Sequence, residues 1–151
     1  MTQHGKPAVV TWLFVTCGAW LIVLGLYFIL LRPPLLPEDA AYMGLPAAQI
    51  RIAVPALESW LRHVFTVMGG FMTSTGVLTV FFATRVMPIQ TRGASWAIAL
   101  AGASSVALMS ATNFALSSAF RWVLLAPAVL WFAGIIMYAR NGSRQRNGVS
   151  A

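Results

Sequence analysis

Polar residues that could do chemistry stand at two places in this chain. Glu58, Arg62 and His63 begin one long apolar segment, and Asn113 and Arg121 flank the boundary between two others. Arginine binds anionic headgroups, and histidine changes protonation near neutral pH, so this set could hold a lipid or exchange a proton with a quinone or a hydrolytic water. A simpler interpretation explains the same residues, because charged side chains at span ends reach into the membrane interface without binding a ligand.

Stronger catalytic or metal-binding patterns are missing from the sequence. His4 lies in the short polar segment before the first apolar stretch, so His63 has no second histidine within the spans for haem ligation. A zinc site would need three or four ligands, and only His63 and scattered carboxylates are available. The single cysteine, Cys17, excludes an intrachain disulfide, and neither a G-x-S-x-G elbow nor a phosphate-binding loop is present. The sequence therefore predicts no catalytic residue, no metal site and no cofactor, and it gives no evidence of an enzyme.

The elements that must position these residues are four apolar segments. None of the thirteen charged residues (ten Lys and Arg, three Asp and Glu) falls within 7–31, 63–84, 93–120 or 122–139. Each segment has at least 18 residues, enough helix to cross a hydrocarbon core of about 30 Å. These lengths predict an all-α, polytopic membrane protein with four transmembrane helices in an antiparallel bundle.

Proline and charge positions set the predicted boundaries of one membrane domain over 1–151. The spans are expected at about 8–31, 60–84, 94–114 and 120–139, followed by a flexible polar tail at 141–151. Pro33 and Pro34 end the first span, and 32–46 is expected to be irregular. Residues 47–54, opened by Pro46, are expected to form a short interfacial helix between spans one and two.

The distribution of basic residues predicts the orientation of the spans. One side carries six Lys and Arg residues, namely Lys6, Arg85, Arg92, Arg140, Arg144 and Arg146, and the other carries four, namely Arg32, Arg51, Arg62 and Arg121. Because cytoplasmic loops are enriched in Lys and Arg, both termini are expected in the cytoplasm. Basic residues scattered singly at span ends do not form a nucleic-acid-binding face, so no nucleic-acid partner is expected.

Small residues recur at helical spacing in spans two and three. In lipid, such rows let helix backbones approach closely, either within one bundle or against another protein. The expected helix-packing residues are Thr66, Gly69, Gly70, Thr73, Gly76, Ala97, Ala101 and Ser104.

Several segments resemble those of a known family. Gly25-Leu26-Tyr27-Phe28, the Pro33-to-Glu38 stretch, Met43-Gly44 and Gly69-Gly70-Phe71-Met72 are similar to small four-helix bacterial integral membrane proteins of the DoxX-like kind, which are largely uncharacterised. The similarity covers roughly the first two spans and implies a bacterial cytoplasmic (inner) membrane location. Some DoxX-type proteins are membrane subunits of quinone-linked redox assemblies, which would imply a partner-dependent role. No active-site residues of the family match this sequence.

Three hypotheses for function follow. The first is a small integral membrane subunit or accessory protein, embedded in the lipid bilayer, that acts by helix–helix association with partner membrane proteins or in a homo-oligomer. The second is a lipid- or quinone-binding protein, with an enzyme left open as a variant, that uses a crevice at the outer interface lined by Glu58, Arg62, His63, Asn113 and Arg121. The third is a small oligomeric transporter with a path lined by Ser and Thr hydroxyls and Asn113.

Overall fold

Helices make up all the regular elements in the computed structural model, which describes residues 9–89, 91 and 93–148, with side chains described as far as residue 140. Four of them are long and apolar enough to cross a membrane: Val9–Leu30, Leu57–Ile89, Ala94–Ala115 and Arg121–Arg140. This confirms the predicted all-α class and the four candidate spans. Lys6 and Arg92, which contributed to the predicted orientation, and His4 lie outside the described residues.

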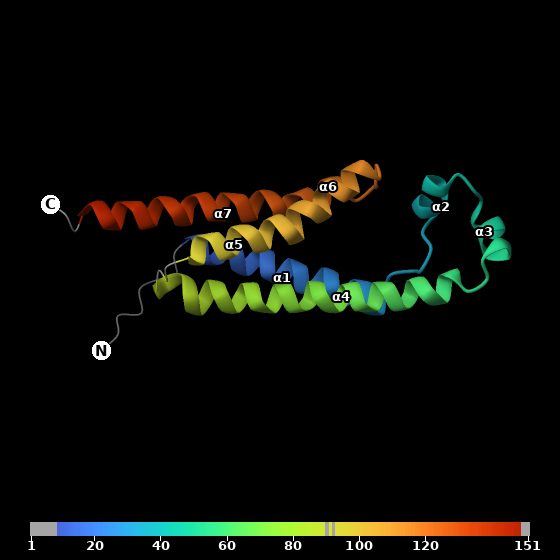
Figure 1. The fold of residues 1–151 in the computed structure, drawn as a ribbon, viewed down its shortest axis with the longest axis horizontal. Coiled ribbons are helices and arrows are strands. Elements are labelled where there is room, and N and C mark those ends of the chain that lie inside the picture. The colour runs from blue at the N-terminus through green and yellow to red at the C-terminus, as the bar shows by residue number, and fades with distance from the viewer. Residues whose placement is uncertain (1–8, 90, 92, 149–151) are drawn as a thin grey trace.

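The first two spans pack side by side in opposite directions (Figure 1). The first is α1 (Val9–Leu30). The second is α4 (Leu57–Phe81), extended by the π-helical turn η1 (Phe82–Val86) and the 3₁₀ turn η2 (Met87–Ile89). This pair makes the most extensive helix–helix contact of the described chain.

Glycines on both helices bring these two backbones close together. Gly25 faces Gly69, and Gly18 faces Gly76. A Cβ atom on Gly69 would lie 2.5 Å from the Gly25 carbonyl oxygen, and one on Gly76 would lie 2.5 Å from that of Gly18. Seven residues separate the glycines within each helix, which is close to two turns and returns to the same face. The contact therefore depends on positions that carry no side chain, as is typical of packing in lipid.

The third and fourth spans form the other half of the molecule. The third runs through α5 (Ala94–Gly102), the π-helical turn η3 (Ala103–Ala107) and α6 (Leu108–Ala115). A turn containing Ser117, with φ of 52°, then leads into α7 (Arg121–Gly148), which has Pro127 in its interior. The helix continues to Gly148, whereas a flexible polar tail was predicted to begin at residue 141. Residues 149–151 lie outside the described residues.

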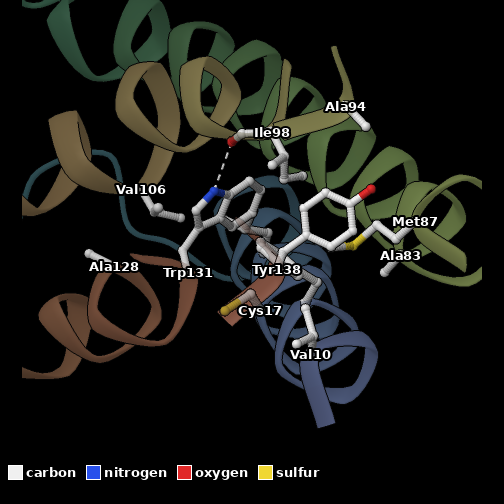
Figure 2. Close-up of a cluster of buried hydrophobic side chains, with 12 residues drawn as sticks. Val10, Cys17, Ala83, Met87, Ala94, Ile98, Val106, Ala128, Trp131 and Tyr138 are labelled. Carbon is white, nitrogen blue, oxygen red and sulfur yellow. Dashed lines mark hydrogen bonds between the residues drawn. The ribbon is translucent and has the colours of Figure 1, made fainter. Parts of the chain in front are cut away.

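The largest fully buried side chain, Trp131 of α7, lies at the centre of the core (Figure 2). Its indole Nε1 donates a hydrogen bond of 2.9 Å to the Ile98 carbonyl of α5, and its ring meets Phe14 of α1 edge to face at 5.4 Å between centroids. The indole packs directly on Gly102, where a Cβ would overlap it. The remaining core residues come from all four spans: Val10, Cys17, Leu21, Ala83, Met87, Ala94, Ile98, Val106, Ala128 and Tyr138.

Two short helices, α2 (Pro37–Met43) and α3 (Ala47–Ala53), occupy the connection between α1 and α4. The first was not expected, because the prolines in 32–46 predict an irregular segment. It forms because Pro37 suits the first helical position and the Asp39 carboxylate accepts the Leu36 N–H at 2.8 Å. Gly44, at φ of 70°, then ends the helix in the left-handed conformation. Both helices lie toward the same end of the molecule as the α6–α7 turn (Figure 1).

Candidate functional site

The five residues predicted to line an outer crevice lie on two different parts of the fold. Glu58, Arg62 and His63 occupy the first turns of α4, whereas Asn113 is in α6 and Arg121 begins α7. Within the described chain, no hydrogen bond, ion pair or ring contact joins the α4 residues to Asn113 or Arg121. The structure therefore brings together a different set at this end of the molecule.

Each of the α4 residues has its own local environment. Glu58 accepts a hydrogen bond from Nε of Arg51 at 2.7 Å, so its partner is on α3 rather than Arg62 one turn along α4. His63 is exposed, and its Nδ1 lies 2.7 Å from the Ser59 carbonyl oxygen. Arg62 is also exposed, and its guanidinium has no hydrogen-bond or ion-pair partner among the residues that the structure describes.

Asn113 and Arg121 make contacts confined to the α6–α7 hairpin. The Asn113 amide donates to the Met109 carbonyl at 2.9 Å, which is a bond within its own helix. The Arg121 guanidinium lies 6.0 Å from the ring centroid of Trp122, which itself meets Phe114 edge to face at 5.1 Å. The described contacts of both side chains therefore stay within this hairpin.

Arg32, which in the sequence served only to predict orientation, has a largely buried side chain. Its side chain is 10% exposed. The guanidinium lies 3.6 Å from the Phe65 ring centroid and 5.2 Å from that of Phe28, an arrangement in which a cation is attracted to the face of an aromatic ring. It donates to the Pro33 carbonyl at 3.1 Å and approaches the Asp39 carboxylate at 3.5 Å.

An open pocket of about 220 Å³ lies where α1 ends and α4 begins. We call it the Arg32–Arg62 pocket, because both arginines line it together with Phe28, Phe65, Pro33, Pro34 and residues 29–31. The sequence did contain one signal for it. Arg32 follows Phe28 by one helical turn, but only the pairing of α1 with α4 shows that Phe65 completes the site.

A second set of contacts joins the two halves of the molecule at the same end. The Glu38 carboxylate of α2 accepts the Ala119 N–H at 3.1 Å and lies 3.4 Å from the Ser118 hydroxyl. Ser118 is buried, and its hydroxyl also accepts the Phe120 N–H at 3.2 Å. Glu38 therefore ties the first loop to the α6–α7 turn, a role that sequence spacing of about 80 residues does not reveal.

The predicted helix-packing residues of α4 divide between two faces. Gly69 and Gly76 are buried against α1, and Thr73 packs against Gly25. Thr66 and Gly70 are exposed instead, and a Cβ on Gly70 would meet nothing within 4 Å.

The predicted packing residues of span three likewise lie mainly outside the core. Ala97 and Ser104 are exposed, and Ala101 is half-buried against the core. The close contact of this span falls one residue on, at Gly102, where the Trp131 indole packs. Close contacts also occur at three glycines that were not among the predicted packing residues: Gly18 and Gly25 of α1 and Gly134 of α7.

Hydroxyl groups along the spans bond to their own helices. Thr73, Thr75 and Thr79 donate to the carbonyls four residues back at 2.7–2.9 Å, and Ser104 and Ser105 do the same in span three. Such bonds satisfy the hydroxyl without a neighbour or water. Each hydroxyl oxygen keeps acceptor lone pairs, so these bonds do not test the transporter hypothesis, which stays a prediction.

Comparison with known proteins adds no further assignment, because no family model, curated protein or solved structure matches the chain. The DoxX-like resemblance therefore stays a prediction. In the described ranges 9–89, 91 and 93–148, no group of three or more His, Cys, Asp and Glu side chains is placed to hold a metal ion.

Proposed function

We propose that the protein is a small multi-pass subunit or accessory component of a bacterial cytoplasmic membrane. In this proposal the four spans form an antiparallel bundle with both termini in the cytoplasm, and α2 and α3 lie at the outer interface. The protein acts by helix–helix association, either with partner membrane proteins or with a second copy of itself.

The outward face of α4 is the observation that carries this proposal. Thr66, Gly70 and Ser74 are spaced four residues apart, and all three are exposed. Gly70 has open space where a Cβ would stand. Span two is also the least buried of the four, with 17% of its most apolar window buried against 28% for each of the others. A row of small residues at this spacing lets a second helix approach closely in lipid.

The division between Gly69 and Gly70 allows a sharp test of this association. Gly70→Leu fills the outward row without touching the inner packing, so we expect it to remove a partner or second copy from the complex while the chain stays folded. The complex would be purified from its host with mild detergent and its composition measured by native mass spectrometry. An unchanged complex in the Gly70→Leu variant would contradict the proposal.

Ala126→Leu is a matched control for this experiment. Ala126 is exposed on α7, so the substitution adds the same side chain to a span surface away from the α4 row. We expect the complex to survive it. Equal loss of the complex in both variants would show that added bulk at any exposed position has this effect, and would remove the support for an α4 interface.

A further inference from the structure

The three carboxylate side chains of this chain are all engaged away from Arg62. Glu38 binds the α6–α7 turn, Asp39 binds the Leu36 N–H and approaches Arg32, and Glu58 binds Arg51. Arg62 lines the same pocket as Arg32. The described chain therefore supplies the Arg32–Arg62 pocket with two cations and only one nearby carboxylate, which leaves a positive charge that an external anion could neutralise.

The geometry of Arg32 prepares one side of this pocket for an anion. Stacking on Phe65 at 3.6 Å fixes the plane of its guanidinium, and the bonds to Pro33 and Asp39 occupy part of its donors. A guanidinium has five N–H donors, so others stay available. The carboxyl-terminal end of α1 opposes an anion with about half a unit of negative charge, which is smaller than the full charge that Arg62 adds.

The surroundings of the pocket favour an anion attached to acyl chains. Leu30 and Leu31 contribute to its lining and are 70% and 72% exposed. The pocket lies at the end of two spans, which is the depth of the phosphate groups if these helices cross a bilayer. Arginine recognises phosphate through two parallel hydrogen bonds, and the Arg62 guanidinium has no partner in the described part of the chain that would compete for them.

From these observations we propose that the Arg32–Arg62 pocket binds the phosphate of an anionic phospholipid, with the acyl chains lying along Leu30 and Leu31. The site requires insertion in a membrane but not the α4 association proposed above. The two proposals can therefore fail separately, because lipid occupancy of one chain and the protein composition of the complex are different measurements.

Native mass spectrometry with added lipid tests the site directly. The purified protein is titrated with phosphatidylglycerol and, in parallel, with phosphatidylcholine. We expect one tightly bound phosphatidylglycerol per chain, and Arg62→Gln should weaken its binding by at least about fivefold, the effect of one basic group at an anionic membrane surface. Unchanged phosphatidylglycerol binding in Arg62→Gln, or equal binding of both lipids, would overturn the proposal.

Arg121→Gln is the matched control, because it removes the same charge from the α6–α7 hairpin. We expect it to change phosphatidylglycerol binding by less than about twofold, and an equal loss in both variants would show a general charge effect and refute a built site.

Inorganic phosphate distinguishes the two sources of the anion. Displacement of the lipid by millimolar phosphate would refute the assignment to a lipid and identify a site for the free anion. Thermal unfolding of each variant is measured alongside, and Arg62→Gln should unfold at the wild-type temperature, because its exposed guanidinium has no hydrogen-bond or ion-pair partner among the described residues.

Discussion

At the scale of single residues, neighbours in the sequence have opposite roles. A Cβ on Gly69 would lie 2.5 Å from the Gly25 carbonyl oxygen and 2.8 Å from the Ile29 side chain, whereas one on Gly70 would meet nothing within 4 Å. The nearest obstacle to Gly69 is backbone, which cannot move aside as a flexible side chain can. Both residues are glycines in the same helix and adjacent in sequence. They differ only in the side of the helix on which each one lies.

We therefore expect Gly69→Ala to lower the free energy of unfolding by about 1–3 kcal/mol, since overpacking a close contact forces the two backbones apart. Gly70→Ala should instead leave it unchanged or raise it by up to about 1 kcal/mol, because its Cβ meets no obstacle and alanine favours the helix more than glycine does. Thermal or denaturant unfolding in detergent, followed by circular dichroism, measures both. Equal destabilisation by the two substitutions would contradict the α1–α4 register.

At the scale of elements, the two halves of the molecule meet differently at their two ends. One end shares a core in which Trp131, Phe14 and Ile98 join α7, α1 and α5. At the other end, the contact between Glu38 and the turn at Ser118 and Ala119 joins α2 to the α6–α7 hairpin. A carboxylate accepting a backbone N–H makes a stronger bond than a neutral acceptor does.

Replacing Glu38 should therefore loosen the α6–α7 turn without unfolding the spans. We expect Glu38→Ala to cost about 1 kcal/mol locally, because the Ala119 N–H is partly open to solvent, and to speed amide exchange there about fivefold. Hydrogen–deuterium exchange of the peptide covering 116–121 measures this. Glu58→Ala is the control, since Glu58 binds Arg51 and should leave that peptide unchanged. If the two variants exchange alike, the Glu38 contact does not order the turn.

At the scale of the whole molecule, the four candidate spans alternate in direction along the long axis (Figure 1). The α1–α4 connection and the α6–α7 turn lie at one end, and the end of η2 and the start of α5 lie at the other. A bilayer around the spans would place these ends in different compartments. The proposed orientation puts the α1–α4 connection outside.

Cysteine labelling in intact cells checks this orientation. Gln49 in α3 and Thr91 before α5 are both exposed, and the native Cys17 is buried, so Cys17→Ala gives a clean background. A membrane-impermeant maleimide should label Gln49→Cys in intact cells and Thr91→Cys only after permeabilisation. The reverse pattern would place both termini outside the cytoplasm and would put the α1–α4 connection and the Arg32–Arg62 pocket on the cytoplasmic side.

The sequence by itself determined the number of candidate spans and their approximate positions. An uninterrupted apolar segment of 18 residues or more satisfies its backbone hydrogen bonds only as a helix in lipid, so charge positions alone mark the segments. It also placed Gly69, Gly76 and Thr73 among the packing candidates, because small residues at helical spacing are a local pattern. The sequence did not predict two helical segments, because their polar or proline-rich composition indicates irregular structure: the extension of α7 to Gly148 and the helix at Pro37–Met43.

The tertiary structure alone decided which faces and which residues meet. A helix that is apolar on every side does not show which face packs, because lipid and protein are equally apolar neighbours. The rotation of α1 and α4 about their axes therefore had to be seen before Gly69 could be told from Gly70, or Arg32 placed on Phe65. The same reason explains why the residues of the predicted crevice do not contact one another across the helices. Glu58, Arg62 and His63 lie at the same end of the molecule as Asn113 and Arg121. Side chains at one depth in the membrane nevertheless meet only where helix packing turns their faces toward each other.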